Sequence, residues 1–145
     1  MKGNDKVLET LNALLADELT AINQYMVHSE MCDNWGYERL HHMVEKRAID
    51  EMKHAERLIA RILFLEGTPI VSRLKEMHIG ADVQKQFASD WAAEADAIKS
   101  YNDAIRQAVE LGDNGSRELL ESILKDEERH LDLIEVQLDQ IKQMG

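Results

Sequence analysis

The sequence predicts an all-α fold, a four-helix bundle with one long crossover between the second and third helices. Three observations lead to this prediction. The seven glycines and one proline of the 145-residue chain leave four long stretches without a helix breaker. Apolar residues recur within each stretch at steps of three or four. The connections within the first and second halves are short, whereas the middle connection is long. We expect one domain, residues 1–145, with room for a sizeable core.

The first half predicts a helical hairpin, because the stretches 4–35 and 37–66 meet at a single glycine. Both stretches are rich in good helix formers such as Leu, Ala, Glu and Lys. The first has an apolar face of Leu11, Leu14, Leu15, Ile22 and Tyr25. The second has an apolar face of Leu40, Val44, Leu58, Ile62 and Leu65. The short connection makes the two helices antiparallel neighbours.

The second half predicts another hairpin from the stretches 81–111 and 116–144. Its first apolar face contains Phe87, Trp91, Ile98, Tyr101 and Ile105. Its second contains Leu120, Ile123, Ile134, Leu138 and Ile141. The connection 67–80, which holds the only proline, is long enough to run the length of the bundle and make the second and third helices parallel.

The net charge of the chain limits the kinds of molecule that it is expected to bind. There are 28 acidic and 17 basic residues, giving a formal charge of −11. This balance disfavours nucleic acid as a partner and favours the binding of cations.

The cysteine count and the apolar runs limit the fold class and the compartment. The single cysteine, Cys32, excludes a disulfide framework and a four-cysteine metal site. The N-terminal Met-Lys-Gly-Asn-Asp begins no apolar stretch, and no run of about 18 apolar residues occurs. We therefore expect neither a signal peptide nor a membrane span, and a cytoplasmic protein.

Six ionisable residues interrupt the apolar faces where a core residue is expected. They are Glu18, Glu51, His54, Glu94, Glu127 and His130. A shift of 76 positions carries Glu18 to Glu94 and the pair Glu51–His54 to Glu127–His130. Residues three apart share a helix face, so each Glu-x-x-His pair can point at one spot. The chain therefore reads as two copies of one hairpin, each supplying three inward groups.

Four inward carboxylates with two histidines predict a pair of divalent metals. The alternative is that the buried charges pair with one another or with arginine, but four carboxylates without matched cations would be very costly to bury. In bundle sites of this kind, one Glu from each of two helices joins a Glu-x-x-His from each of the others. We expect Glu51 and Glu127 to bridge the metals. Oxygen-rich ligands with imidazole favour iron or manganese.

Other motifs have simpler interpretations. Met52 lies about 100° around the helix from Glu51, and a second apolar face there is typical of a subunit interface. A third Glu-x-x-His pair, Glu38 with His41, has no partner motif, so we interpret it as a solvated helix end. The histidines outside the two inward pairs are expected at the surface: His28, His41, His42 and His78.

Several segments resemble the bacterioferritin family over the whole chain. They are Met1-Lys2-Gly3, Ala21-Ile22-Asn23-Gln24-Tyr25, Ile49-Asp50-Glu51-Met52-Lys53-His54-Ala55-Glu56, Arg61-Ile62-Leu63-Phe64-Leu65-Glu66-Gly67 and Asp126-Glu127-Glu128-Arg129-His130. The resemblance implies a ferritin-like bundle assembled from dimers into a twenty-four-subunit shell. All six inward residues match the ligands of the family's di-iron ferroxidase centre.

The resemblance also implies roles for residues outside that ligand set. Tyr25 matches the tyrosine beside the di-iron centre. Met52 matches the methionine that ligates a haem b together with its copy from a two-fold partner. The polar lining of a family pore is matched by Asn34, Glu66, Asp132 and Asp139. A histidine found in some members is replaced by Lys46, which makes an extra iron site with Asp50 doubtful.

The expected function is iron storage and detoxification by a ferroxidase. Fe²⁺ would be oxidised with O₂ or H₂O₂, ferric mineral deposited in the shell, and iron released with electrons passed through the haem from a ferredoxin. Alternatives are a rubrerythrin-like peroxidase, a haem or iron carrier without catalysis, and a DNA-protecting mini-ferritin. The sequence leaves open the preferred oxidant, the porphyrin, whether a second subunit type co-assembles, and whether iron stays at the centre.

Overall fold

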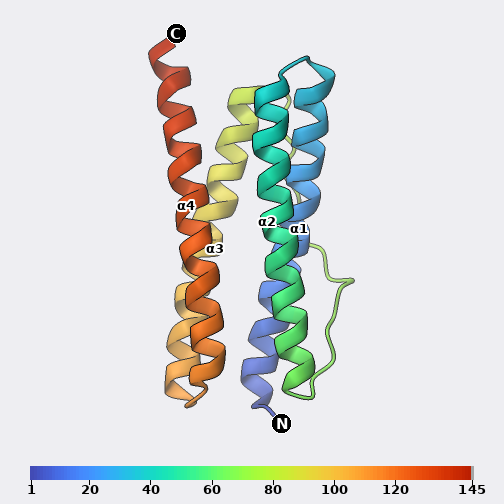
Figure 1. Ribbon diagram of the computed structural model, residues 1–145, viewed down its shortest axis with the longest axis vertical. Helices are drawn as coiled ribbons and strands as arrows, with labels where there is room; N and C mark the ends of the chain where they lie inside the picture. Colours follow the sequence, from blue (N-terminus) through green and yellow to red (C-terminus); the bar gives the residue numbers. More distant parts are fainter. Residues whose placement is uncertain (145) are drawn as a thin grey trace.

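The computed structural model describes residues 1–144 and consists of four long helices and their connections. The helices are α1 (Asp5–Asn34), α2 (Glu38–Phe64), α3 (Val83–Glu110) and α4 (Asn114–Met144). These bounds confirm the predicted four-helix bundle to within about three residues at each end. Figure 1 shows that α2 and α3 run in the same direction and that the crossover between them follows one side of the bundle. Within the described residues, no helix combines the length and hydrophobicity that a membrane span requires.

Local sequence signals explain where the helices begin and end. Asn4 caps α1 by accepting a hydrogen bond from the backbone N–H of Lys6, and Asp82 caps α3 in the same way. The two hairpin turns contain Gly36 and Gly112, whose φ angles of 84° and 71° lie in the left-handed region that glycine tolerates best. The predicted fourth stretch began at residue 116, but α4 already begins at Asn114, because the Asp113 carboxylate accepts from the Ser116 N–H and caps it.

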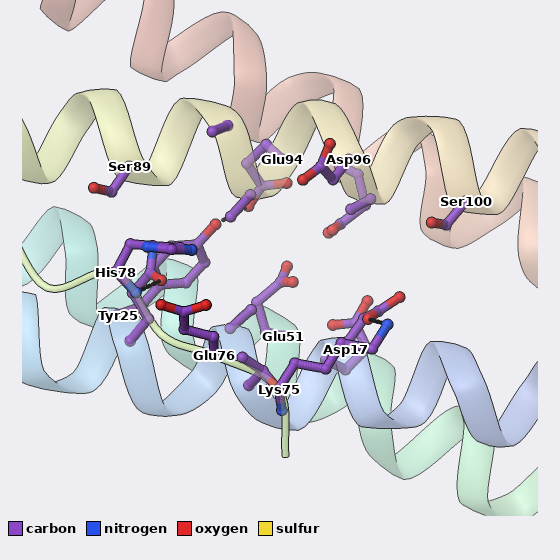
Figure 2. Close-up of a pocket in the computed structure, with 18 of the residues that line it drawn as sticks. Asp17, Tyr25, Glu51, Lys75, Glu76, His78, Ser89, Glu94, Asp96 and Ser100 are labelled. Atoms are coloured by element: carbon purple, nitrogen blue, oxygen red, sulfur yellow. Dashed lines mark hydrogen bonds and ion pairs between the residues drawn. The ribbon is translucent and has the colours of Figure 1, made fainter. Parts of the chain in front are cut away.

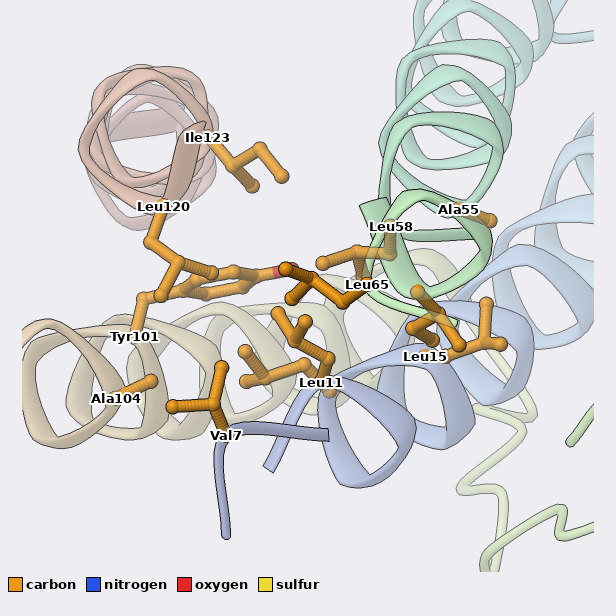
Figure 3. Close-up of a cluster of buried hydrophobic side chains, with 12 residues drawn as sticks. Val7, Leu11, Leu15, Ala55, Leu58, Leu65, Tyr101, Ala104, Leu120 and Ile123 are labelled. Atoms are coloured by element: carbon orange, nitrogen blue, oxygen red, sulfur yellow. The ribbon is translucent and has the colours of Figure 1, made fainter. Parts of the chain in front are cut away.

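The main apolar core is formed by residues of all four helices, and Figure 3 shows its side chains packed between them. Leu11, Leu58 and Ile123 are completely buried there, together with Tyr101. One residue of the predicted apolar faces is exposed: Trp91 has 38% of its surface accessible, and its indole N–H donates to Glu135 on α4. Tryptophan favours such a position because it can bury its rings while its N–H keeps a polar partner.

The crossover, residues 65–82, is held against α1 by side chains at helical spacing. The amide of Asn12 accepts from the backbone N–H of Ile70 and donates to the carbonyl of Thr68. Further along α1, Thr20 accepts from the N–H of Lys75. These bonds satisfy backbone groups that have no partner in regular secondary structure. The crossover is thereby placed over the opening that leads to the polar centre of the bundle.

Candidate di-metal centre

The six inward residues predicted from the sequence meet in the middle of the bundle. All are buried, with at most 2% of each residue exposed. One ligand atom of each residue lies within 4.8 Å of the others in two overlapping groups. The first group is Glu18, Glu51, His54 and Glu127, and the second is Glu51, Glu94, Glu127 and His130. The spacing of 76 residues thus places the two halves of the centre face to face.

Glu51 and Glu127 belong to both groups, which is the arrangement expected of bridging carboxylates. The Nδ1 atom of His54 lies 3.4 Å from Glu51 and 3.2 Å from Glu127. The Nδ1 atom of His130 lies 3.2 Å and 3.5 Å from the same two carboxylates. Glu18 lies near His54, and Glu94 lies near His130. Each imidazole therefore shares its space with one terminal and two central carboxylates.

The donor atoms of this centre lack hydrogen-bond partners. In residues 1–144, every buried side-chain nitrogen or oxygen without a partner belongs to one of the six residues. These atoms are Glu18 Oε2, Glu51 Oε1, His54 Nδ1, Glu94 Oε2, both oxygens of Glu127, and His130 Nδ1. Buried polar atoms are normally paired, because an unpaired one costs about 1–3 kcal/mol. The cluster of unpaired atoms therefore fits cations, and its oxygen-rich donors with two imidazoles fit iron or manganese.

Two aspartates orient the histidines from the far side of each ring. His54 Nε2 donates to Asp126 at 2.8 Å, and His130 Nε2 donates to Asp50 at 3.0 Å. Each bond joins one hairpin to the other, because His54 and Asp50 are on α2 whereas His130 and Asp126 are on α4. With Nε2–H held by a carboxylate, Nδ1 is the atom left to bind a cation.

Two tyrosines hold the terminal glutamates. Tyr25 donates to Glu94 at 2.6 Å, and Tyr101 donates to Glu18 at 2.7 Å. Burial and the adjacent Glu94 raise the pKa of Tyr25, while burial and the adjacent Glu18 raise the pKa of Tyr101. Both phenols thus keep their protons. The sequence singled out Tyr25 alone; the shift of 76 from Tyr25 to Tyr101 was the signal for the second.

The pKa values reflect an excess of negative charge. Burial raises the pKa values of Glu51 and Glu127, and neighbouring carboxylates raise them further. Burial lowers the pKa of His130, but the adjacent carboxylates of Glu127 and Glu94 outweigh burial and raise the pKa to about 10. The same balance, with Glu127 as the strongest partner, raises the pKa of His54. Divalent cations would relieve this repulsion.

A buried polar network adjoins the centre and was missed by the sequence analysis. The Asp90 carboxylate accepts from Gln24 at 2.9 Å, His28 at 2.9 Å and Arg47 at 3.2 Å. The prediction that His28 lies at the surface was wrong, because its ring is completely buried and accepts from the N–H of Gly80. Arg47 also packs over the Tyr25 ring, 5.2 Å from its centre.

The position of this network could have been found from helical spacing. Asp90 precedes Glu94 by four residues, and Arg47 precedes Glu51 by four. Each therefore continues an inward face by one turn. The sequence left open that inward charges pair with arginine, and Asp90 and Arg47 form such a buried ion pair beside the centre. The six residues of the centre include no lysine or arginine that could pair with their carboxylates.

A cavity of about 620 Å³ connects the centre to the surface. Figure 2 shows Glu51 and Glu94 at its inner end, with Tyr25 beside them. Its outer part is lined by charged residues of three segments: Asp17, Lys75, Glu76 and Asp96. Lys75 from the crossover forms an ion pair with Asp17 of α1. Small ions and O₂-sized molecules thus have a path to the six residues that is charged at its outer end.

The remaining predicted residues lie away from the centre. Met52 is 46% exposed on the outer face of α2, beside the exposed Ile49. The residues likened to a pore lining are all exposed: Asn34, Glu66, Asp132 and Asp139. The prediction of surface histidines holds for His42 and His78, and His41 is half-buried. Lys46 pairs with Asp50 at 3.3 Å and so takes up one oxygen of that carboxylate.

Comparison with known proteins agrees with this geometry. The model of the ferritin-like domain matches residues 8–144. The chain is 42% identical to a bacterioferritin of Rhodobacter capsulatus, covering all of this chain and 90% of that protein. It is 41% identical to bacterioferritins of Brucella melitensis and Mycobacterium leprae, covering all of this chain and 90% and 91% of those proteins. The protein with this centre of four glutamates and two histidines therefore belongs to the bacterioferritin family.

Proposed function

We propose that this protein stores iron and oxidises Fe²⁺ to Fe³⁺ at the six-residue centre. The observation that carries the proposal is the set of unpaired, buried donor atoms in two overlapping groups that share Glu51 and Glu127. Glu18 and His54 would complete the binding of one Fe²⁺, and Glu94 and His130 the binding of the other. Membership of the bacterioferritin family supports iron as the metal.

The residues of the centre would favour oxidation by electrostatics. Four carboxylates stabilise the higher charge of Fe³⁺ more than that of Fe²⁺. Two Fe²⁺ ions held side by side deliver two electrons together, so that O₂ with two protons gives H₂O₂, or H₂O₂ gives two hydroxide ions. The hydrogen bonds from Tyr25 and Tyr101 keep Glu94 and Glu18 in place during this change of charge. Tyr25 lines the cavity, and its oxidation to a tyrosyl radical would supply a further electron to the oxidant.

Assembly and release complete the proposal. The product Fe³⁺ would be deposited as mineral inside a twenty-four-subunit cytoplasmic shell built from dimers. The exposed apolar face of α1 and α2, with Met26, Ile49 and Met52, suits a dimer interface. The Met52 thioether fits as a ligand of haem b, which supplies electron transfer when bound. A ferredoxin would supply those electrons for iron release.

The test is stopped-flow addition of Fe²⁺ to the metal-free protein in air. We expect a fast phase that saturates near two Fe²⁺ per chain and is abolished by Glu18→Ala or His130→Ala. Glu38→Ala is the matched control, because Glu38 begins an exposed Glu-x-x-His pair outside the centre. A slow phase that never saturates and is the same in all variants would refute the ferroxidase.

A further inference from the structure

A second group of potential metal ligands lies outside the buried centre, in the first turns of α2. It consists of His41, His42 and Glu45. One ligand atom of each residue lies within 4.8 Å of the others. The group is about 20 Å along α2 from His54, so it does not belong to the centre described above. The proposed ferroxidase does not use these residues.

The ring of His41 is fixed by a buried residue of α1. The Ser29 hydroxyl donates to the His41 carbonyl at 3.2 Å, so its oxygen accepts from His41 Nδ1, which lies 2.9 Å away. The Ser29 carbonyl, which can only accept, lies 3.0 Å from the same nitrogen. Nδ1 therefore carries the proton, and in the neutral ring Nε2 has a free lone pair. Metal-binding histidines are oriented by the same kind of outer hydrogen bond.

The free nitrogen of His41 faces the other two members of the group. His41 Nε2 lies 3.7 Å from one oxygen of Glu45. The other oxygen of Glu45 lies 4.0 Å from Nδ1 of His42. The two imidazole rings are 4.9 Å apart between their centres. The Glu45 carboxylate thus stands between two imidazoles, at separations that one bound cation would shorten.

The surroundings of the group attract positive charge. The carboxylates of Asp33, Glu45 and Glu30 favour positive charge at His41. Glu38 lies 3.8 Å from the Nε2 atom of His42. Carboxylates of α1 and α2 therefore surround the imidazoles from both helices, which raises the local concentration of cations.

We propose that His41, His42 and Glu45 bind one divalent transition-metal cation of the Zn²⁺ or Co²⁺ type. Two imidazoles and one carboxylate suit such borderline cations, and three protein ligands leave at least one position for water. His42 and Glu45 are exposed in the single chain and lie two helical turns before Ile49 and Met52 on the same face of α2. The cation therefore reaches this group without passing through the cavity that leads to the buried centre.

Equilibrium dialysis of the full-length, metal-free protein against Co²⁺ tests this site, with visible absorption as a second readout. We expect His42→Ala and Glu45→Gln each to weaken the binding of one Co²⁺ per chain by at least about tenfold. Both side chains are exposed, so neither change disturbs the core. Glu38→Gln is the matched control, because it removes one nearby charge but no member of the group.

The outcomes separate this site from the ferroxidase. Glu18→Ala should reduce Co²⁺ binding at the buried centre and leave the surface Co²⁺ in place. The proposal is overturned if the wild type, His42→Ala and Glu45→Gln bind equal amounts of Co²⁺ with equal affinity. It is also overturned if Glu38→Gln loses as much binding as Glu45→Gln, because diffuse attraction would then account for the effect.

Discussion

Tyr101 on α3 donates a hydrogen bond of 2.7 Å to Glu18 on α1. Its counterpart, from Tyr25 on α1 to Glu94 on α3, measures 2.6 Å. Each hairpin thus holds the terminal glutamate of the other. The histidines are held in the same way, because His54 donates to Asp126 of the other hairpin and His130 donates to Asp50. The two copies of the sequence pattern thus form one centre in which each copy orients the metal-facing residues of the other.

The two tyrosines provide a matched pair of variants. Both Tyr25→Phe and Tyr101→Phe should slow the fast Fe²⁺ phase several-fold, because each frees an oxygen of a terminal glutamate. Only Tyr25 lines the cavity, whereas Tyr101 packs in the apolar core. We therefore expect a tyrosyl radical signal in rapid-freeze electron paramagnetic resonance that Tyr25→Phe removes and Tyr101→Phe retains. A signal that survives Tyr25→Phe would contradict the assignment of this electron to Tyr25.

Replacing Asp126 tests the orientation of His54. In Asp126→Asn the ring loses its charged partner, so metal affinity at the buried centre should fall by about 10- to 100-fold. Co²⁺ titration of the metal-free protein measures this affinity. Asp50→Asn should behave alike by the internal symmetry, and Glu128→Gln, an exposed change beside the centre, should not. Equal affinities for Asp126→Asn and wild type would show that the bond does not orient His54.

Glu127 belongs to both groups of potential metal ligands, which implies a conflict between stability and metal binding. In chelator, Glu127→Gln should stabilise the protein by about 1 kcal/mol, because it removes one of four buried carboxylates. Burial and repulsion by the other three carboxylates both raise the pKa of Glu127. Saturating Co²⁺ should reverse the order, since the wild type binds the cation more tightly. Thermal unfolding with and without Co²⁺ measures both effects, with Glu128→Gln as the matched charge control. A variant less stable than wild type in chelator would contradict the repulsion.

The N-terminus of α4 should make stability depend on pH. Burial raises the pKa of Asp113, but hydrogen bonds from Ser116 and the charge of Arg61 outweigh it, and the pKa lies below its usual value near 4. A carboxyl with a lowered pKa stabilises the fold above its unfolded pKa and loses that contribution as the pH falls through its folded pKa. Asp113→Asn should therefore be less stable than wild type by about 1 kcal/mol at pH 7.

That difference between wild type and Asp113→Asn should shrink from about pH 4 downward. Thermal unfolding of both proteins between pH 7 and pH 3 measures it. Asp139→Asn, an exposed change on α4, is the control and should leave the difference from wild type nearly constant. A gap at Asp113 that widens as the pH falls would reverse the sign and refute the argument.

The role of Met52 can be read from absorption. Met52→Leu should remove the Soret band of haem from protein purified after haem-supplemented expression, because leucine keeps the bulk but lacks the thioether. Met26→Leu, on the same exposed face, should keep the band. A Soret band unchanged in Met52→Leu would mean that haem is held by another residue.

The sequence by itself determined the fold class and the six inward residues. Both follow from helical periodicity, which is local: a residue three or four positions from a buried neighbour shares its face whatever the rest of the chain does. The repeat of 76 residues added the pairing of the two hairpins. Glu18, Glu51 and His130 could therefore be identified without any knowledge of how the helices cross.

Only the tertiary structure decided which side chains meet across helices. Periodicity shows that Asp90 faces inward, but its partners Arg47 and His28 depend on the axial register of three helices and the crossover. The same holds for the bond between His54 and Asp126. The axial register of the helices is set by side-chain packing and by the crossover together, so it cannot be predicted from any single stretch of sequence. For this reason the predicted ligands were found together, whereas the contacts that orient them became visible only in three dimensions.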